Sequence, residues 1–212
     1  MVKARAGLTA VALAAVVAAT AAACSSGSNG KPQTEKQRVQ MLLDRANAET
    51  KAKNYDAANR DLYGVLAIQP DNLYAHYDRG VVAEAAGHPG IAIDEYDIEL
   101  QLYPTYGPAM YNLAMLLKTS DPVRAESLFR KIVTLHPVAP LAYYNLGLLE
   151  FDRHQLGGAA NDLARAVQQN PALQTSLTKA QRRLIAHVHL APLPTPAPTS
   201  TSSPTPSTST TP

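Results

Sequence analysis

The chain has 212 residues, of which 46% are hydrophobic, and a formal net charge of +2, which allows one medium-sized domain with flanking segments. Without Lys3 and Arg5 near the N-terminus, the chain has 17 basic groups (19 − 2) and 17 acidic groups. A protein with no net charge gains little free energy from displacing counterions on nucleic acid, so a nucleic-acid partner is not expected. The single cysteine, Cys24, excludes an internal disulfide and a zinc site built on several thiolates.

The first 23 residues have the parts of a secretory signal peptide. A short basic segment precedes an uncharged apolar stretch over residues 7–23, and small residues lead directly into Cys24. This junction resembles the lipobox of bacterial lipoproteins. The resemblance implies cleavage before Cys24, lipidation of its thiol, and attachment to the extracytoplasmic face of the cell membrane through a flexible tether over 24–35. An uncleaved membrane anchor and a cleaved, soluble protein are the alternatives.

Four copies of one pattern follow between residues 39 and 172. Prolines at positions 70, 104, 137 and 171 are separated by 34, 33 and 34 residues. Ahead of each proline stands a small residue, followed 11 or 12 residues later by an alanine and four residues after that by a large apolar residue. In chain order the small residues are Ala46, Gly80, Ala114 and Gly147, the alanines are Ala58, Ala92, Ala125 and Ala159, and the large residues are Leu62, Tyr96, Phe129 and Leu163.

This pattern resembles the tetratricopeptide repeat, a 34-residue unit with the signature aromatic-x2-Leu-Gly, Ala-x3-Phe and Pro. The resemblance implies an all-α fold, a right-handed α-solenoid of four helical hairpins over about 39–71, 72–105, 106–138 and 139–172. The periodicity of the apolar residues independently predicts two short helices in each copy. We expect the small residues to lie where the two helices of a pair approach closely, and each proline to end the second helix.

A capping helix is predicted over residues 173–190, because apolar residues such as Leu177 and Leu184 recur at helical spacing while Lys179, Arg182 and Arg183 lie on another face. It completes a repeat domain over 36–190. The segment 191–212 is rich in Pro, Ser and Thr and has no charge, so we expect it to be disordered. Such a tract can be glycosylated, and a proline-rich tail can also occupy the groove of its own or a neighbouring molecule.

Three tyrosines recur at one register, three residues before the small residue of their copy. In tetratricopeptide domains this register faces the concave groove, so the resemblance implies a tyrosine on three successive repeats. Tyrosine replaces the lysine with which some relatives bind a C-terminal carboxylate, which argues against that mode of binding. Packing between neighbouring helices is the alternative role for these rings. The predicted partner-binding residues are Tyr77, Tyr111, Asn112, Met115, Lys118, Tyr144, Asn145, Leu148 and Phe151.

The remaining polar motifs indicate no chemistry. In a helix His187 and His189 point apart, so we predict no metal site, and no cofactor motif is present. The acidic run over 94–99 is expected on a solvated outer face. A Ser-His-Asp arrangement, a glycine-rich phosphate loop and an HExxH motif are all missing from the sequence, so we expect a protein that is not an enzyme.

The predicted function is therefore that of a membrane-anchored scaffold in the cell envelope, which binds a peptide or helix of a protein partner in its concave groove. Two alternatives stay open. The chain could be a pilot or assembly chaperone lipoprotein for one envelope, pilus or secretion-system subunit, or it could be an accessory subunit of an envelope enzyme.

Overall fold

The structure is a computed structural model, and it describes residues 34–192. This part of the chain is helical and contains no β-strand, which confirms the predicted fold class of stacked helical hairpins. Its helices are α1 Glu35–Lys51, α2 Tyr55–Ile68, α3 Ala75–Ala85, α4 Pro89–Leu102, α5 Gly107–Leu117, α6 Pro122–Leu135, α7 Pro140–Asp152, α8 Leu156–Gln169, the 3-10 helix η1 Pro171–Ser176, and α9 Lys179–Ile185.

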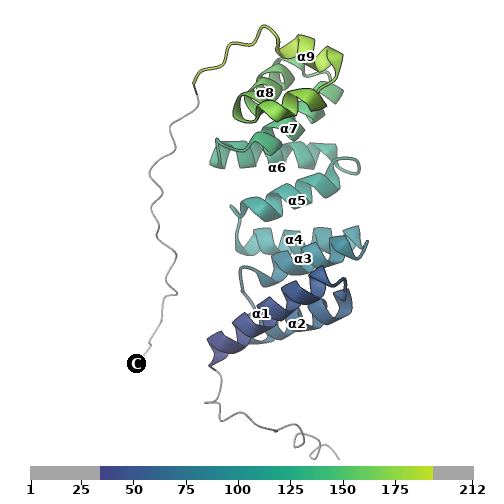
Figure 1. Ribbon diagram of the computed structural model, residues 1–212, viewed down its shortest axis with the longest axis vertical. Helices are drawn as coiled ribbons and strands as arrows, with labels where there is room; N and C mark the ends of the chain where they lie inside the picture. Colours follow the sequence, from purple (N-terminus) through teal and green to yellow (C-terminus); the bar gives the residue numbers. More distant parts are fainter. Residues whose placement is uncertain (1–33, 193–212) are drawn as a thin grey trace, which may run out of the picture. The chain divides into compact units, whose positions relative to one another are not determined.

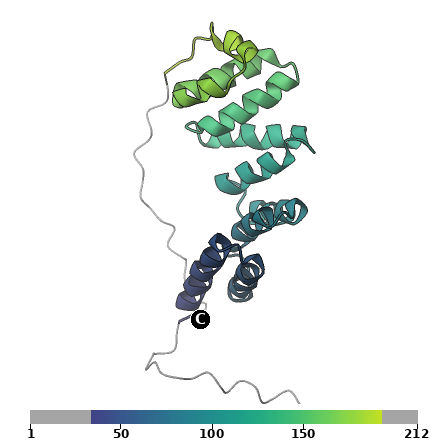
Figure 2. The same ribbon diagram turned by 45° about the vertical axis from the view of Figure 1, so that its right-hand side comes forward.

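The helices stack in chain order from α1 to α9 (Figure 1), and each packs mainly against its neighbours in sequence. The closest packing is within the pairs α1–α2, α3–α4, α5–α6 and α7–α8. Figure 2 shows the same succession from a second direction. The buried hydrophobic residues form one large cluster from Ala83 to Leu149 and two smaller ones around α1 and α2, centred on Leu62 and Val65. None of the helices between residues 34 and 192 combines the length and hydrophobicity that a membrane span requires.

The repeated motif residues form the centre of this core. The four alanines of the pattern and the four large residues that follow them are all 0% exposed. Gly80 and Gly147 lie where the helices of a pair meet: a methyl group on Gly80 would overlap the ring of Tyr96, and one on Gly147 would lie 2.8 Å from Cγ of Leu163. The expectation that small residues permit close helix approach is therefore confirmed at both glycines.

The repeated prolines follow the ends of the second helices, as predicted. Helices α2, α4, α6 and α8 each end two residues before the proline of their copy. The residue between the end of each helix and its proline still donates its backbone N–H to the carbonyl four residues earlier, as His136 does to Ile132 at 2.7 Å. Proline has no N–H to extend this pattern, and it disfavours the helical conformation in the residue before it.

The C-terminal cap differs from the single helix expected over 173–190. It consists of η1 and α9, and Leu177, which is 3% exposed, lies in the connection between them. Two helix-starting residues explain the division. The Asn170 side chain accepts from the backbone N–H of Ala172, and Thr178 forms a capping box with Gln181.

The expectation that the acidic run over 94–99 lies on a solvated face is only partly correct. Asp94 is exposed, but Glu95 is 6% exposed and Glu99 is 0% exposed. Oε1 of Glu95 pairs with Arg79 and Oε2 with Nδ1 of His76, at 2.8 and 2.9 Å. Since α4 packs on α3 and α5, it buries more of its surface than an outer helix would.

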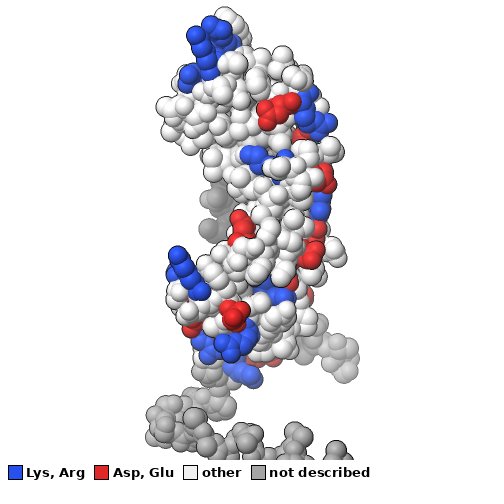
Figure 3. Space-filling model, turned by 90° about the vertical axis from the view of Figure 1, so that its right-hand side faces the viewer, with Lys and Arg blue, Asp and Glu red and all other residues white. Residues whose placement is uncertain are grey.

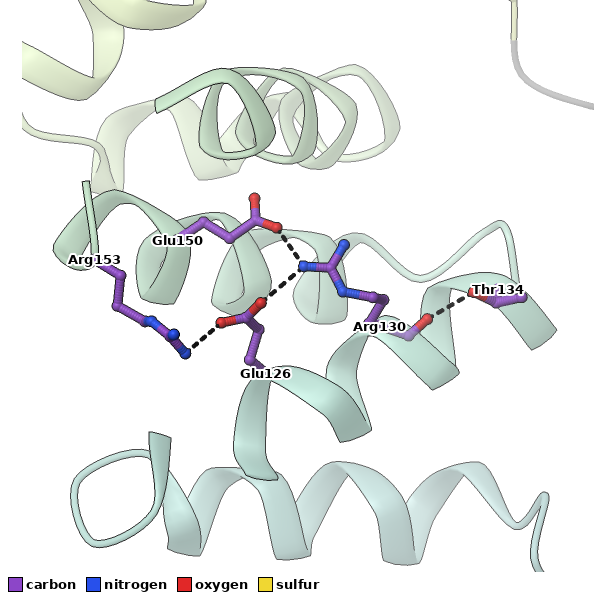
Figure 4. Close-up of polar contacts among 5 residues, drawn as sticks. All are labelled: Glu126, Arg130, Thr134, Glu150 and Arg153. Carbon is purple, nitrogen blue, oxygen red and sulfur yellow. Dashed lines mark hydrogen bonds and ion pairs between the residues drawn. The ribbon is translucent and has the colours of Figure 1, made fainter. Parts of the chain in front are cut away.

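Another buried carboxylate, Glu150, belongs to an ion network between α6 and α7 (Figure 4). Arg130 donates to Glu150 and to Glu126, and Arg153 donates to Glu126, each at 2.8 Å. Glu150 is 2% exposed and its second oxygen has no partner among the described residues. Burial and the neighbouring Glu150 raise the pKa of Asp162 on α8 to about 7, so Asp162 is only partly ionised at neutral pH.

Candidate partner-binding face

The predicted binding residues lie on α3, α5 and α7, the first helices of their pairs. Together with α1 these helices form one face of the stack, here called the first-helix face. The repeated residues Tyr77, Tyr111 and Tyr144 are all half-buried on it. Each ring therefore has one side against the protein and one side accessible, a combination of rigid apolar area and a polar tip that suits molecular recognition.

The tyrosines are joined to the next repeat by a recurring hydrogen bond. Nδ2 of Asn112 donates to the Tyr77 hydroxyl at 3.4 Å, and Nδ2 of Asn145 donates to the Tyr111 hydroxyl at 3.3 Å. We call this series the tyrosine–asparagine ladder. It ends at Tyr144, whose hydroxyl donates instead to the backbone carbonyl of Ser176 in η1 at 3.4 Å. The ladder thus connects α3 to α5, α5 to α7, and α7 to the C-terminal cap.

Aromatic contacts fix the rings further. Tyr77 meets Tyr106 edge-on at a centroid distance of 5.3 Å, and Tyr111 meets Phe129 in the same way at 5.7 Å. Burial raises the pKa of the Tyr77 and Tyr111 hydroxyls, while the hydrogen bond that each accepts from its asparagine lowers it in part. Both phenols are therefore neutral at pH 7, and neither O–H has an acceptor among the described residues.

Two predicted residues have internal roles. Asn145 is 6% exposed, and its amide also donates to the Leu141 carbonyl at 2.8 Å and accepts from Nζ of Lys118 at 2.8 Å. The amide of Asn112 also donates to the Tyr96 hydroxyl at 3.1 Å. The Asn145 side chain is therefore fully engaged in contacts within the stack.

The predicted apolar residues differ in accessibility. Met115 on α5 is 40% exposed, whereas Leu148 and Phe151 on α7 are half-buried. Sequence reasoning missed Tyr74 and Leu141, which are 52% and 48% exposed. Both stand three residues before a ladder tyrosine, so helical spacing from the tyrosines could have found them. In the space-filling view of Figure 3, charged side chains line the right-hand edge of the stack and also gather at its upper end and over its lower part, and the surface between them is largely uncharged.

No metal centre is formed by the described part of the chain, which has no group of three or more His, Cys, Asp or Glu residues able to hold an ion. Cys24, the signal segment 1–23 and residues 193–212 lie outside the described residues. Lipidation, export and occupation of a groove by the tail therefore stay predictions.

Comparison with known proteins supports the fold. No family model and no curated protein matches the sequence significantly. A solved structure of MamA is 19% identical, with 74% of this chain and 100% of that chain covered and a TM-score of 0.60. YrrB, described as a TPR (tetratricopeptide-repeat) protein with an unusual peptide-binding site, is 20% identical, with 65% and 74% covered and a TM-score of 0.55. The first TPR of RPAP3, solved bound to an HSP90 peptide, is 16% identical, with 56% and 94% covered and a TM-score of 0.51. This chain therefore has the fold of TPR solenoids.

Proposed function

We propose that this chain is a lipid-anchored, extracytoplasmic scaffold whose first-helix face binds a segment of a partner protein. The observation that carries the proposal is the recurrence of accessible apolar side chains beside the ladder, at Tyr74, Met115 and Leu141. A surface of this kind, with neutral phenols ready to donate, suits an extended or helical segment with apolar side chains and free carbonyls. Two proteins with the same fold, YrrB and RPAP3, are described as binding peptides.

Crosslinking from Met115 tests the binding face. A photoreactive amino acid replaces Met115, whose exposed side chain can be changed with little effect on packing. The matched control carries the same group at Val123, a 62% exposed residue at the start of α6. We expect adducts from position 115 that mass spectrometry maps to one segment of one partner, and none of these from position 123. Equal adducts from both positions would contradict the proposal.

The anchor rests on the apolar stretch that ends at Cys24. Diacylglyceryl transfer to the thiol, with acylation of the new N-terminus, supplies the multiple acyl chains that stable attachment requires. We expect the wild-type protein to enter the detergent phase in a phase-separation assay and Cys24→Ala to stay in the aqueous phase or remain uncleaved. Ser25→Ala is the control, since it leaves the thiol in place. Identical masses and partitioning for wild type and Cys24→Ala would refute the anchor without affecting the binding face.

A further inference from the structure

The tyrosine–asparagine ladder is interrupted at the first repeat. Asn112 and Asn145 directly follow a tyrosine and bond to the tyrosine one repeat earlier. Asp78 stands at the same place in α3, directly after Tyr77. Its partner would come from α1, but the residue 34 positions before Tyr77 is Leu43, which has no hydroxyl. The first step of the ladder thus has a carboxylate in place of an amide and an apolar side chain in place of a phenol.

Asp78 is consequently a half-buried carboxylate without a partner. Within residues 34–192 its side chain makes no hydrogen bond and no ion pair, and burial raises its pKa to about 6. An ionised carboxylate held away from water is costly unless a cation or hydrogen-bond donors compensate it. Glu99 also lacks a hydrogen-bond partner among the described residues, but its side chain is 0% exposed, whereas Asp78 lines open space.

That space is a pocket of about 150 Å³ between α1 and α3. Water occupies about 30 Å³ per molecule in the liquid, so the pocket can hold the end of a long side chain. Its polar lining consists of Asp78, Asn47 and Thr50, and its apolar lining of Ala46, Leu62 and Val81. The Thr50 hydroxyl already donates to the Ala46 carbonyl at 2.7 Å, so its oxygen is left as an acceptor.

The lining matches the chemistry of a primary ammonium group. An ammonium has three donors and no acceptor, and the three polar residues that line the pocket, Asp78, Asn47 and Thr50, each carry an oxygen that can accept a hydrogen bond. Hydrogen bonds between an ammonium and a carboxylate are about twice as strong as neutral ones. The apolar wall can contact the methylene stem of the same side chain.

We propose that this pocket binds a lysine side chain of the partner segment held on the first-helix face. The inference rests on the proposed function and adds to it which part of the partner segment lies at which end of the first-helix face. The lysine lies at the α1–α3 end, and apolar residues of the partner lie along α5 and α7, near Met115. Neighbouring helices pack about 8–10 Å apart. If the lysine and the apolar residue of the partner are separated by one to one and a half helix spacings, they are about three to five residues apart in an extended chain at about 3.3 Å per residue.

A peptide selection followed by single-atom changes tests this. The full chain, purified in detergent, is exposed to a positional-scanning library of acetylated decapeptides. We expect selected peptides to carry lysine about three to five residues from an apolar residue. Replacing that lysine by norleucine, which keeps the stem and removes the ammonium, should weaken binding about tenfold to a hundredfold, and Asp78→Asn should do the same.

Matched variants separate charge from folding. Asp94→Asn makes the same chemical change at an exposed position of α4 and should leave binding unchanged. The double variant Leu43→Tyr with Asp78→Asn supplies the phenol and the amide that the first step of the ladder lacks, and it removes the carboxylate from the pocket. It should fold, as circular dichroism can check, and lose the preference for lysine over norleucine.

The outcomes distinguish this inference from the proposed function. Peptides that lose affinity in Met115→Glu but bind equally with lysine or norleucine would retain the scaffold and refute the lysine pocket. A lysine preference that survives Asp78→Asn, or a preference for arginine over lysine, would also refute it. Failure of the library to yield any binding peptide would overturn both proposals.

Discussion

Asn145 of α7 donates a hydrogen bond of 3.3 Å to the hydroxyl of Tyr111 in α5, and Asn112 repeats this contact to Tyr77 one repeat earlier. Both asparagines directly follow the tyrosine of their own copy. The Tyr-Asn dipeptide therefore connects successive repeats. Its tyrosine accepts a hydrogen bond from the asparagine of the next copy, and its asparagine donates one to the tyrosine of the previous copy. This explains why Tyr-Asn recurs in the sequence with the spacing of the repeat.

Removing a ladder asparagine should loosen the contact between pairs. Asn145→Ala leaves the Tyr111 hydroxyl and Nζ of Lys118 without their partner, and we expect a loss of about 1–2 kcal/mol in the free energy of unfolding. Urea unfolding of Asn145→Ala, Tyr111→Phe and the double variant forms a mutant cycle. The losses should be less than additive. Fully additive losses would show that the contact contributes nothing to stability.

Replacing a glycine by alanine should lower the free energy of unfolding where two helices meet closely and raise it where the glycine faces open space. Gly147→Ala would place a methyl group 2.8 Å from Leu163 and 3.0 Å from its backbone nitrogen, so overpacking should lower the free energy of unfolding by about 1–3 kcal/mol. Gly157→Ala in α8 meets no atom within 4 Å and should raise it by about 0.5–1 kcal/mol through helix propensity. Thermal unfolding of both variants checks this pair, and a destabilised Gly157→Ala would contradict the explanation.

The sequence predicts the backbone of this fold better than its surfaces. The alanines and large apolar residues of the motif, such as Ala125 and Phe129, are identified by spacing alone because the repeat forces them into the same buried place in every copy. The prolines are equally predictable, since their effect on a helix is local. The cap was predicted less well, because its division depends on the side-chain hydrogen bonds of Asn170 and Thr178.

The contacts of the predicted binding residues could be predicted only in part for a related reason. The register of Tyr77 and Tyr111 follows from the motif, but the engagement of Asn145 by three groups depends on contacts between copies. Glu99 shows the limit most clearly. The other copies have Val65, Ile132 and Ala166 at its position, so a pattern of charge suggested a solvated residue where the repeat has a core position. Repeat register was the better guide there.

Two arginines on α6 should differ in their importance although both form ion pairs. Arg130 neutralises Glu150, whose side chain is 3% exposed, whereas Arg124 pairs with Asp97, whose side chain is 30% exposed. Loss of Arg130 leaves an uncompensated buried carboxylate, so we expect Arg130→Met to cost about 3–5 kcal/mol. Arg124→Met should cost under about 1 kcal/mol, as for other surface pairs. Urea unfolding at pH 7 compares them, and equal losses would contradict this account of the network.

Glu99 gives the fold a dependence on pH. Its side chain is 0% exposed and neither oxygen accepts a hydrogen bond within the described part of the chain. Burial, with a further contribution from the charge of Asp78, raises the pKa of Glu99 to about 7, and the nearby backbone N–H of Tyr77 offsets only part of this. A carboxyl with a raised pKa binds its proton more tightly in the folded state. The folded state is therefore favoured at low pH, and stability falls as the pH rises from about 4.5 to about 7.

Replacing Glu99 by an apolar side chain should remove the part of the pH dependence that Glu99 contributes. Methionine has a similar unbranched shape, so Glu99→Met should raise the free energy of unfolding by roughly 2–3 kcal/mol at pH 8, where Glu99 is ionised, and by much less at pH 5. Asp78 and Asp162, with pKa values raised to about 6 and about 7, should still give Glu99→Met a stability that falls as the pH rises, but with a lower slope than in the wild type. Urea unfolding at both pH values measures the difference. An unchanged slope in Glu99→Met would mean that Glu99 keeps the same proton affinity in the folded and unfolded chain, and hence that its burial is not maintained in solution.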